Sequence, residues 1–192
     1  MKNTIFALNT VHKQIAAMLI ATILMWVAGA PAWMVSRAGA AQLVSVSDTL
    51  SDSDKNVVSN HTVRFTTSAT GQLTAGETIL ISFSPFDIPN GGGMDYTEID
   101  MTVGAVEQTM AAVAAGGSWG VTVDDAADTI LITSGTSTIG VSTAVEIEIG
   151  THATYQQTGG VQITNPNPGS PTSYPITIGG TMDDSGITRV AI

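Results

Sequence analysis

The sequence predicts an all-β fold, an immunoglobulin-like antiparallel β-sandwich of roughly nine or ten strands, preceded by an N-terminal hydrophobic signal or anchor helix. Three observations predict it. Apolar and polar residues alternate along short segments from residue 43 onward. Turn-forming residues separate these segments at fairly regular intervals, and a long uncharged apolar run lies near the N-terminus. We therefore expect residues 1–40 to be a signal peptide or membrane anchor and residues 42–192 to be the sandwich domain.

The N-terminal segment has the features of an export signal. Lys2 and Lys13 supply positive charge, and residues 15–30 carry no charge. Small residues at 38–40 suit cleavage before Ala41 by a signal peptidase. Extended through residue 35, the apolar run is long enough to span a bilayer if it is not cut. Both alternatives place residues 41–192 outside the cell, and an uncleaved chain would contact the membrane only through residues 15–35.

Each expected strand has apolar side chains on one face and polar side chains on the other. This period of two indicates half-buried antiparallel strands. The segments are rich in Val, Ile and Thr, which suit a pleated surface. In chain order the clearest expected strands lie at residues 62–66, 78–83, 98–103, 119–123, 130–132, 145–149 and 176–178.

Clusters of Gly, Asn, Asp, Ser and Pro predict the turns between strands. They lie at residues 74–76, 89–93, 116–118, 124–128, 134–135, 159–160, 165–171 and 179–180. The one stretch that could be helical is residues 105–115, which is rich in Ala. It is short and lacks a clear cap, so it could equally form an edge strand.

The part of the chain from residue 41 onward is acidic and has no cysteine. It holds all 16 acidic residues and three of the basic ones, a formal charge of −13. Such a surface repels phosphate backbones, so we expect no nucleic-acid partner. Without disulfides, packing and backbone pairing must stabilise the fold. About 150 residues suffice for one domain with a single core.

No credible catalytic set is present, and we expect that the protein is not an enzyme. Residues 116–120 match G-x-S-x-G, but a strand pattern at 121–123 follows where the nucleophile elbow of serine hydrolases requires a helix. We therefore expect a hairpin turn there. His61 has the strand parity of Val63 and Phe65, which predicts a core or strand-end side chain that hydrogen-bonds locally.

Calcium is the one metal ion that the sequence suggests, and we expect no other cofactor. Several acidic turns offer oxygen ligands of the kind that Ca²⁺ prefers. The turn beginning at Asp52 lacks the Gly and Glu that an EF-hand needs at its sixth and twelfth positions. The alternative is that these residues form turns and carry solvated charge. The weak calcium candidates are Asp52, Asp54, Asn56, Asp124, Asp125 and Asp128.

Two classes of function remain open. The first is an extracellular structural or adhesive module of the cell surface that either assembles with itself or begins a larger surface protein. Its apolar ends, residues 43–44 and 190–192, could pair with strands of a neighbour. The alternative is a carbohydrate-binding module, with Phe86, Tyr96 and Tyr155 as a platform of aromatic rings. These rings could instead close the ends of the sandwich. The expected partners are therefore other surface proteins, a second copy or glycans.

Four stretches of the sequence resemble an uncharacterised group of exported β-sandwich domains. They are residues 45–54 (SVSDTLSDSD), 59–67 (SNHTVRFTT), 75–79 (AGETI) and 163–166 (ITNP). The group belongs to cell-surface proteins of candidate-phylum (Patescibacteria-type) bacteria, and the similarity covers about residues 42–192. The resemblance implies a surface location and a sandwich that follows a signal peptide and leads into further surface domains. It implies no catalytic residues.

Overall fold

The computed structural model describes residues 41–91, 93–155 and 159–192. The chain divides into two units, Met1–Gly39 and Ala40–Ile192, and the described residues all belong to the second. The expected signal or anchor helix within residues 1–40 therefore lies outside the described residues. Within the described ranges, no helix is long and apolar enough to cross a membrane.

The larger of two main sheets has seven strands in the order β1-β14-β13-β5-β10-β9-β8. Neighbouring strands pair antiparallel, except that β1 runs parallel to β14 and β8 runs parallel to β9. The bounds are β1 Ala41–Gln42, β5 Thr78–Ser82, β8 Met110–Ala111, β9 Trp119–Asp124, β10 Thr129–Thr133, β13 Ser173–Gly180 and β14 Asp184–Ala191.

The smaller main sheet has five antiparallel strands in the order β2-β4-β11-β6-β7. Its bounds are β2 Val44–Leu50, β4 His61–Thr66, β6 Ile99–Val103, β7 Val106–Glu107 and β11 Ala144–Ile149. A further pair, β3 Val58–Ser59 with β12 Ile163–Thr164, and a 3₁₀ turn, η1 Tyr96–Glu98, lie in the connections.

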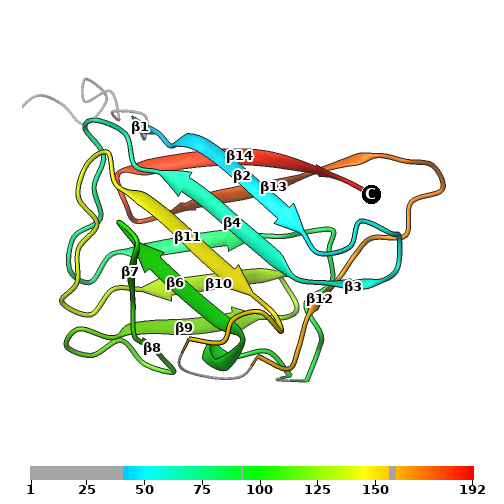
Figure 1. Cartoon of the computed structure of the whole chain (residues 1–192), viewed down its shortest axis with the longest axis horizontal. Coiled ribbons are helices and arrows are strands. Elements are labelled where there is room, and N and C mark those ends of the chain that lie inside the picture. Colours follow the sequence, from blue (N-terminus) through cyan, green and yellow to red (C-terminus); the bar gives the residue numbers. More distant parts are fainter. Residues whose placement is uncertain (1–40, 92, 156–158) are drawn as a thin grey trace, which may run out of the picture. The chain divides into compact units, whose positions relative to one another are not determined.

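The two sheets form the layers of a sandwich (Figure 1), with β2, β4, β11 and β6 crossing in front of β13, β5, β10 and β9. Alternation along each strand turns one set of side chains inward. The core is built from aliphatic residues of both sheets and four large rings, Phe65, Phe83, Phe86 and Trp119. Burial of this apolar surface is the main stabilising term, because the chain has no disulfide.

The all-β prediction is confirmed in its main lines. Every strand that the alternation placed is present, within three residues at the ends. The described residues form fourteen strand segments rather than nine or ten, and five of these are only two residues long. The other nine are the strands of five residues or more, long enough for a period of two to be recognised.

Residues 105–115 do not form a helix. Gly104 and Ala105 both have left-handed φ, 58° and 63°, and they make the two-residue turn of the β6–β7 hairpin. The rest of the stretch supplies β7 and β8, each at the edge of a main sheet. Of the two alternatives that the Ala-rich composition left open, the edge strand is therefore the correct one.

Candidate functional site

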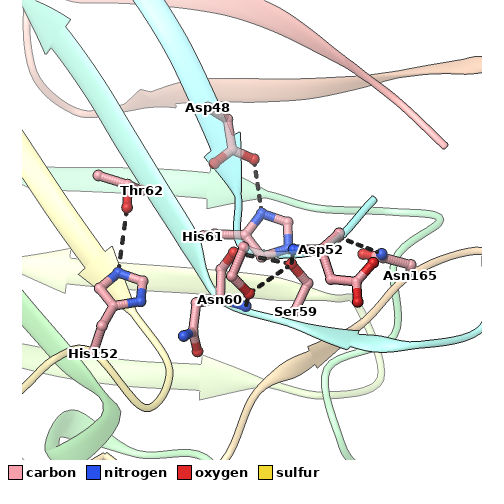
Figure 2. A network of polar contacts seen from close by, with 9 residues as sticks. Asp48, Asp52, Ser59, Asn60, His61, Thr62, His152 and Asn165 are labelled. Atoms are coloured by element: carbon pink, nitrogen blue, oxygen red, sulfur yellow. Dashed lines mark hydrogen bonds and ion pairs between the residues drawn. The ribbon is translucent and has the colours of Figure 1, made fainter. Parts of the chain in front are cut away.

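A buried carboxylate–imidazole pair lies between β2 and β4 (Figure 2). The Nδ1 atom of His61 is 2.7 Å from Oδ2 of Asp48, and both side chains are fully buried. The His61 ring makes edge contacts with Phe83 and Phe86, at centroid distances of 5.1 and 5.3 Å. This confirms that His61 is a core side chain with a local hydrogen bond. A substrate cannot touch groups that have no exposed surface, so the pair links two strands in this conformation.

A second set of polar contacts joins the chain connections beside this pair (Figure 2). The Asn165 side-chain amide donates to the backbone carbonyls of Asp52 and Asp54, at 2.9 and 2.8 Å. The Ser59 hydroxyl accepts the backbone N–H of Asp52 at 3.2 Å. Thr62 Oγ1 lies 3.3 Å from Nε2 of His152. These bonds satisfy loop backbone groups, which supports a structural role for this end of the sandwich.

The pattern of the sequence contained one signal for the buried pair. Val46, Asp48 and Leu50 share the parity of an inward-facing set on β2, so an acid occupies an apolar position. A buried carboxylate requires a partner, and His61 has the same inward parity on β4. What the alternation could not supply was the register, which places Leu50 opposite His61 and Asp48 opposite Val63.

The calcium candidates lie in two turns, at residues 52–56 and 124–128, and four of them accept hydrogen bonds from nearby backbone. Asp52 Oδ1 accepts from the amide of Asp54, and Asp124 Oδ1 accepts from the amides of residues 126 and 127. Asp125 and Asp128 accept from residues 91 and 88, and Asn56 has a left-handed φ of 57°. Among the described residues, no three acidic or His side chains converge to hold a metal. Calcium binding stays a prediction.

The aromatic platform does not form in the expected way. Phe86 is fully buried and packs edge-on against His61 and Tyr174, so it offers no face to a ligand. The reason is a turn after β5, in which the amide of Phe86 bonds the carbonyl of Phe83 and directs the ring inward. Tyr96 is half-buried against the core, whereas Tyr155 is 55% exposed.

The G-x-S-x-G match is a turn, as expected. The amide of Ser118 bonds the carbonyl of Ala115, and the chain then enters β9 at Trp119. Trp119 is buried, and its indole N–H donates to Gln108 at 3.1 Å. Since a strand follows Ser118, the geometry of a nucleophile elbow is absent there.

The outer faces of the two sheets differ in charge. On the five-stranded sheet, Glu148 lies directly opposite Asp100, and Glu146 lies opposite Arg64, with which it forms an ion pair. Burial and the charges of Asp100, Glu148 and Glu146 raise the pKa of Glu107 on the same sheet. The hydrogen bond to Glu146 raises the pKa of Arg64. This face is therefore negative, with one guanidinium among the acids.

The centre of the outer face of the seven-stranded sheet carries no charge. Leu80, 37% exposed, lies opposite Leu131 on one side and Gly179 on the other. The uncharged outward positions around it are Thr78, Ser82, Thr122, Thr129, Thr133, Thr177 and Ile187. Asp124 at the end of β9 and Arg189 on β14 are charged residues toward the margins of this face. Hydroxyl and methyl groups thus cover the centre of the face, in a domain that is otherwise strongly acidic.

The seven-stranded sheet also has an open edge. β1 pairs with Asp184 and Ser185, and the amide of Leu43 bonds the carbonyl of Ser185, before the chain crosses to the other sheet as β2. No other described strand pairs with this edge of β14 from residue 186 to 191. Ile187, at the start of the open length, is exposed. Such an edge can accept an added strand.

Five chains of solved structures are similar to this chain, among them the two that follow. No protein-family model and no curated protein sequence matches the chain. A structure of the RrgA Jo.In complex is 12% identical with a TM-score of 0.41, and 69% of each chain is covered. A collagen-binding domain from a Staphylococcus aureus adhesin is 12% identical with a TM-score of 0.36, covering 78% of this chain and 98% of that domain. These scores are too low to support an argument about function.

Proposed function

We propose that residues 42–192 form an extracellular structural or adhesive module of the cell surface, with residues 1–40 as its signal peptide or membrane anchor. The uncharged centre of the outer face of the seven-stranded sheet, near the open edge of β14, carries this proposal. A domain with a formal charge of −13 repels its own copies across most of its surface. The uncharged face and the open edge are where a second copy or another surface protein can approach and form backbone and apolar contacts.

Sedimentation velocity of the full chain over a range of concentrations tests this function. We expect the mean mass to rise with concentration. Leu80→Lys places a charge at the centre of the uncharged face and should abolish the rise. Ala144→Lys, on an exposed position of the opposite face, should preserve it. A wild-type chain that stays monomeric at about 1 mM would count against self-assembly.

The alternative function is a carbohydrate-binding module. One observation favours it, a hollow on the outer face of the five-stranded sheet with a volume of about 440 Å³. The hollow and the uncharged face lie on opposite sheets. A saccharide that binds the chain without reducing its self-association would therefore separate the two functions.

A further inference from the structure

The hollow of the five-stranded sheet has the size of a ligand site. Its volume of about 440 Å³ lies within the ~300–1,000 Å³ that is usual for small-molecule sites. Strands β2, β4, β11 and β6 and the β6–β7 turn all contribute to it. The polar side chains in its lining include those of Ser45, Ser47, Arg64, Thr66, Thr102 and Glu146.

Strained backbone forms both rims of the hollow. On β2, pairing with β4 shifts register between Val44 and Ser47, and Ser45 within this bulge has a φ of 54°. On the other side, Ala105 in the β6–β7 turn has a φ of 63°. These are two of the five non-glycine residues with positive φ in the described ranges. Bulges and left-handed residues are costly and recur beside functional sites.

The floor offers a donor and an acceptor side by side. Arg64 Nε donates to Glu146 Oε2 at 2.6 Å, and the two side chains are 47% and 34% exposed. Neither the terminal guanidinium nitrogens nor Glu146 Oε1 bonds another described residue. The ion pair therefore holds N–H donors and a carboxylate oxygen at fixed positions facing the hollow. This spacing suits two neighbouring hydroxyl groups of a ligand.

Four hydroxyl groups around the ion pair have no partner among the described residues. They belong to Ser45, Ser47, Thr66 and Thr102. Elsewhere in the described chain, similar hydroxyls hold the fold together, as when Thr67 donates to Gly140 and Ser68 donates to Asp184. Each unused hydroxyl can both donate and accept, which matches the hydroxyl groups of a sugar.

Charge and the absence of an exposed ring narrow the class of ligand. Asp100, Glu107 and Glu148 lie on the same face, so anionic polymers are repelled. A cationic group at the floor would meet the guanidinium of Arg64. The one ring in the lining, Phe65, is 2% exposed and belongs to the core. Recognition must therefore come from hydrogen bonds to a neutral ligand rather than from stacking.

We propose that this hollow is a binding site for a neutral saccharide, held by the Arg64–Glu146 pair and the hydroxyls of Ser45, Ser47, Thr66 and Thr102. The inference rests on the carbohydrate-binding function given above as the alternative. It replaces the aromatic platform with a polar site.

Amide chemical shifts of the ¹⁵N-labelled full chain test the site. The probes are cellohexaose, maltohexaose and N,N′,N″-triacetylchitotriose, with oligogalacturonate and oligolysine as charged comparisons. We expect at least one neutral saccharide to shift amides at residues 45–47, 64–66, 102–105 and 144–146. Shifts from a neutral saccharide at a different surface would overturn this site but leave the carbohydrate-binding function standing. No shift with any neutral saccharide, or shifts with oligolysine alone, would overturn both.

Matched variants connect the binding to the proposed groups. Thr102→Val and Arg64→Ala should each lower the affinity for the saccharide that shifts these amides at least tenfold, because each removes hydrogen bonds from the hollow. Thr129→Val, also half-buried on the outer face of the other sheet, should leave affinity unchanged. Thermal unfolding shows whether each variant is folded. Equal weakening by Thr102→Val and Thr129→Val would contradict the assignment.

Discussion

Two neighbouring aspartates should differ sharply in their contribution to stability. Asp184, at the start of β14, is 1% exposed and accepts two hydrogen bonds from Ser68, from the amide at 2.6 Å and from the hydroxyl at 2.9 Å. The same Ser68 hydroxyl accepts the amide of Gly71 at 2.7 Å. Asp184 therefore orders the loop at residues 68–71. Asp183 is exposed, and its carboxylate accepts one long bond, 3.4 Å, from Gln72.

The size of the effect follows from the number of bonds lost. Hydrogen bonds to a charged group contribute about 1.5–3 kcal/mol each, and water entering the site offsets part of that loss. We expect Asp184→Ala to lower the free energy of unfolding by about 3 kcal/mol, or Tm by about 6–12 °C. Asp183→Ala should change it by less than about 0.5 kcal/mol. Asp184→Asn, which keeps one acceptor oxygen, should fall between the two.

Urea unfolding of the full chain, followed by intrinsic fluorescence, measures these differences. The slope of the transition should be the same for all variants, since none changes the buried area much. Equal losses of stability in the two alanine variants would refute this role of Asp184. A neutral Asp184→Ala would refute it as well, because the loop would then be ordered by other contacts.

Three further predictions concern packing, pH and calcium. Gly120→Ala should lower the free energy of unfolding by more than about 2 kcal/mol, whereas Gly117→Ala should be nearly neutral, as thermal melts can show. A Cβ at Gly120 would lie 2.3 Å from the Ala114 amide nitrogen, and one at Gly117 meets nothing within 4 Å. Hydrogen bonds from Thr97 lower the pKa of Asp95, so its stabilising effect is present at neutral pH and is lost as pH falls through the folded-state pKa. Asp95→Asn should therefore reduce Tm at pH 7 more than at pH 2; equal losses would contradict this. Ca²⁺ bound at the turn of residues 52–56 or at that of residues 124–128 should raise Tm in millimolar Ca²⁺ relative to a chelator; an unchanged Tm would contradict the calcium prediction.

Much of the strand layout could be predicted because a strand's exposure pattern is a local property. Val145, Ile147 and Ile149 face inward and Glu146 and Glu148 outward, as their alternation indicates. Strands of two residues, such as β7 and β8, carry too few positions for any period. Their residues instead share an Ala-rich stretch, and pairing with β6 and β9 decides their conformation.

The candidate sites could be predicted less well. Phe86 was a candidate for the aromatic platform because it lies near a loop, with closing the end of the sandwich as the alternative; a turn directs its ring into the core. The hollow had no signal in the sequence. Its six groups come from four separate regions of the chain, and only the register of β2, β4, β11 and β6 brings them onto one face.

The sequence by itself determined the all-β class, seven of the nine longer strands and the acidic, disulfide-free character of residues 41–192. These follow from composition and from a period of two, which depend on near neighbours in the chain. Tertiary structure alone decided which acids are buried, as Asp48 and Asp184 are and Asp183 is not. It also decided which hydroxyls remain without partners around Arg64 and Glu146. The burial of these acids and the unpartnered state of these hydroxyls depend on contacts between residues far apart in the chain. The register of the sheets and the crossing of the chain from β1 to β2 create those contacts.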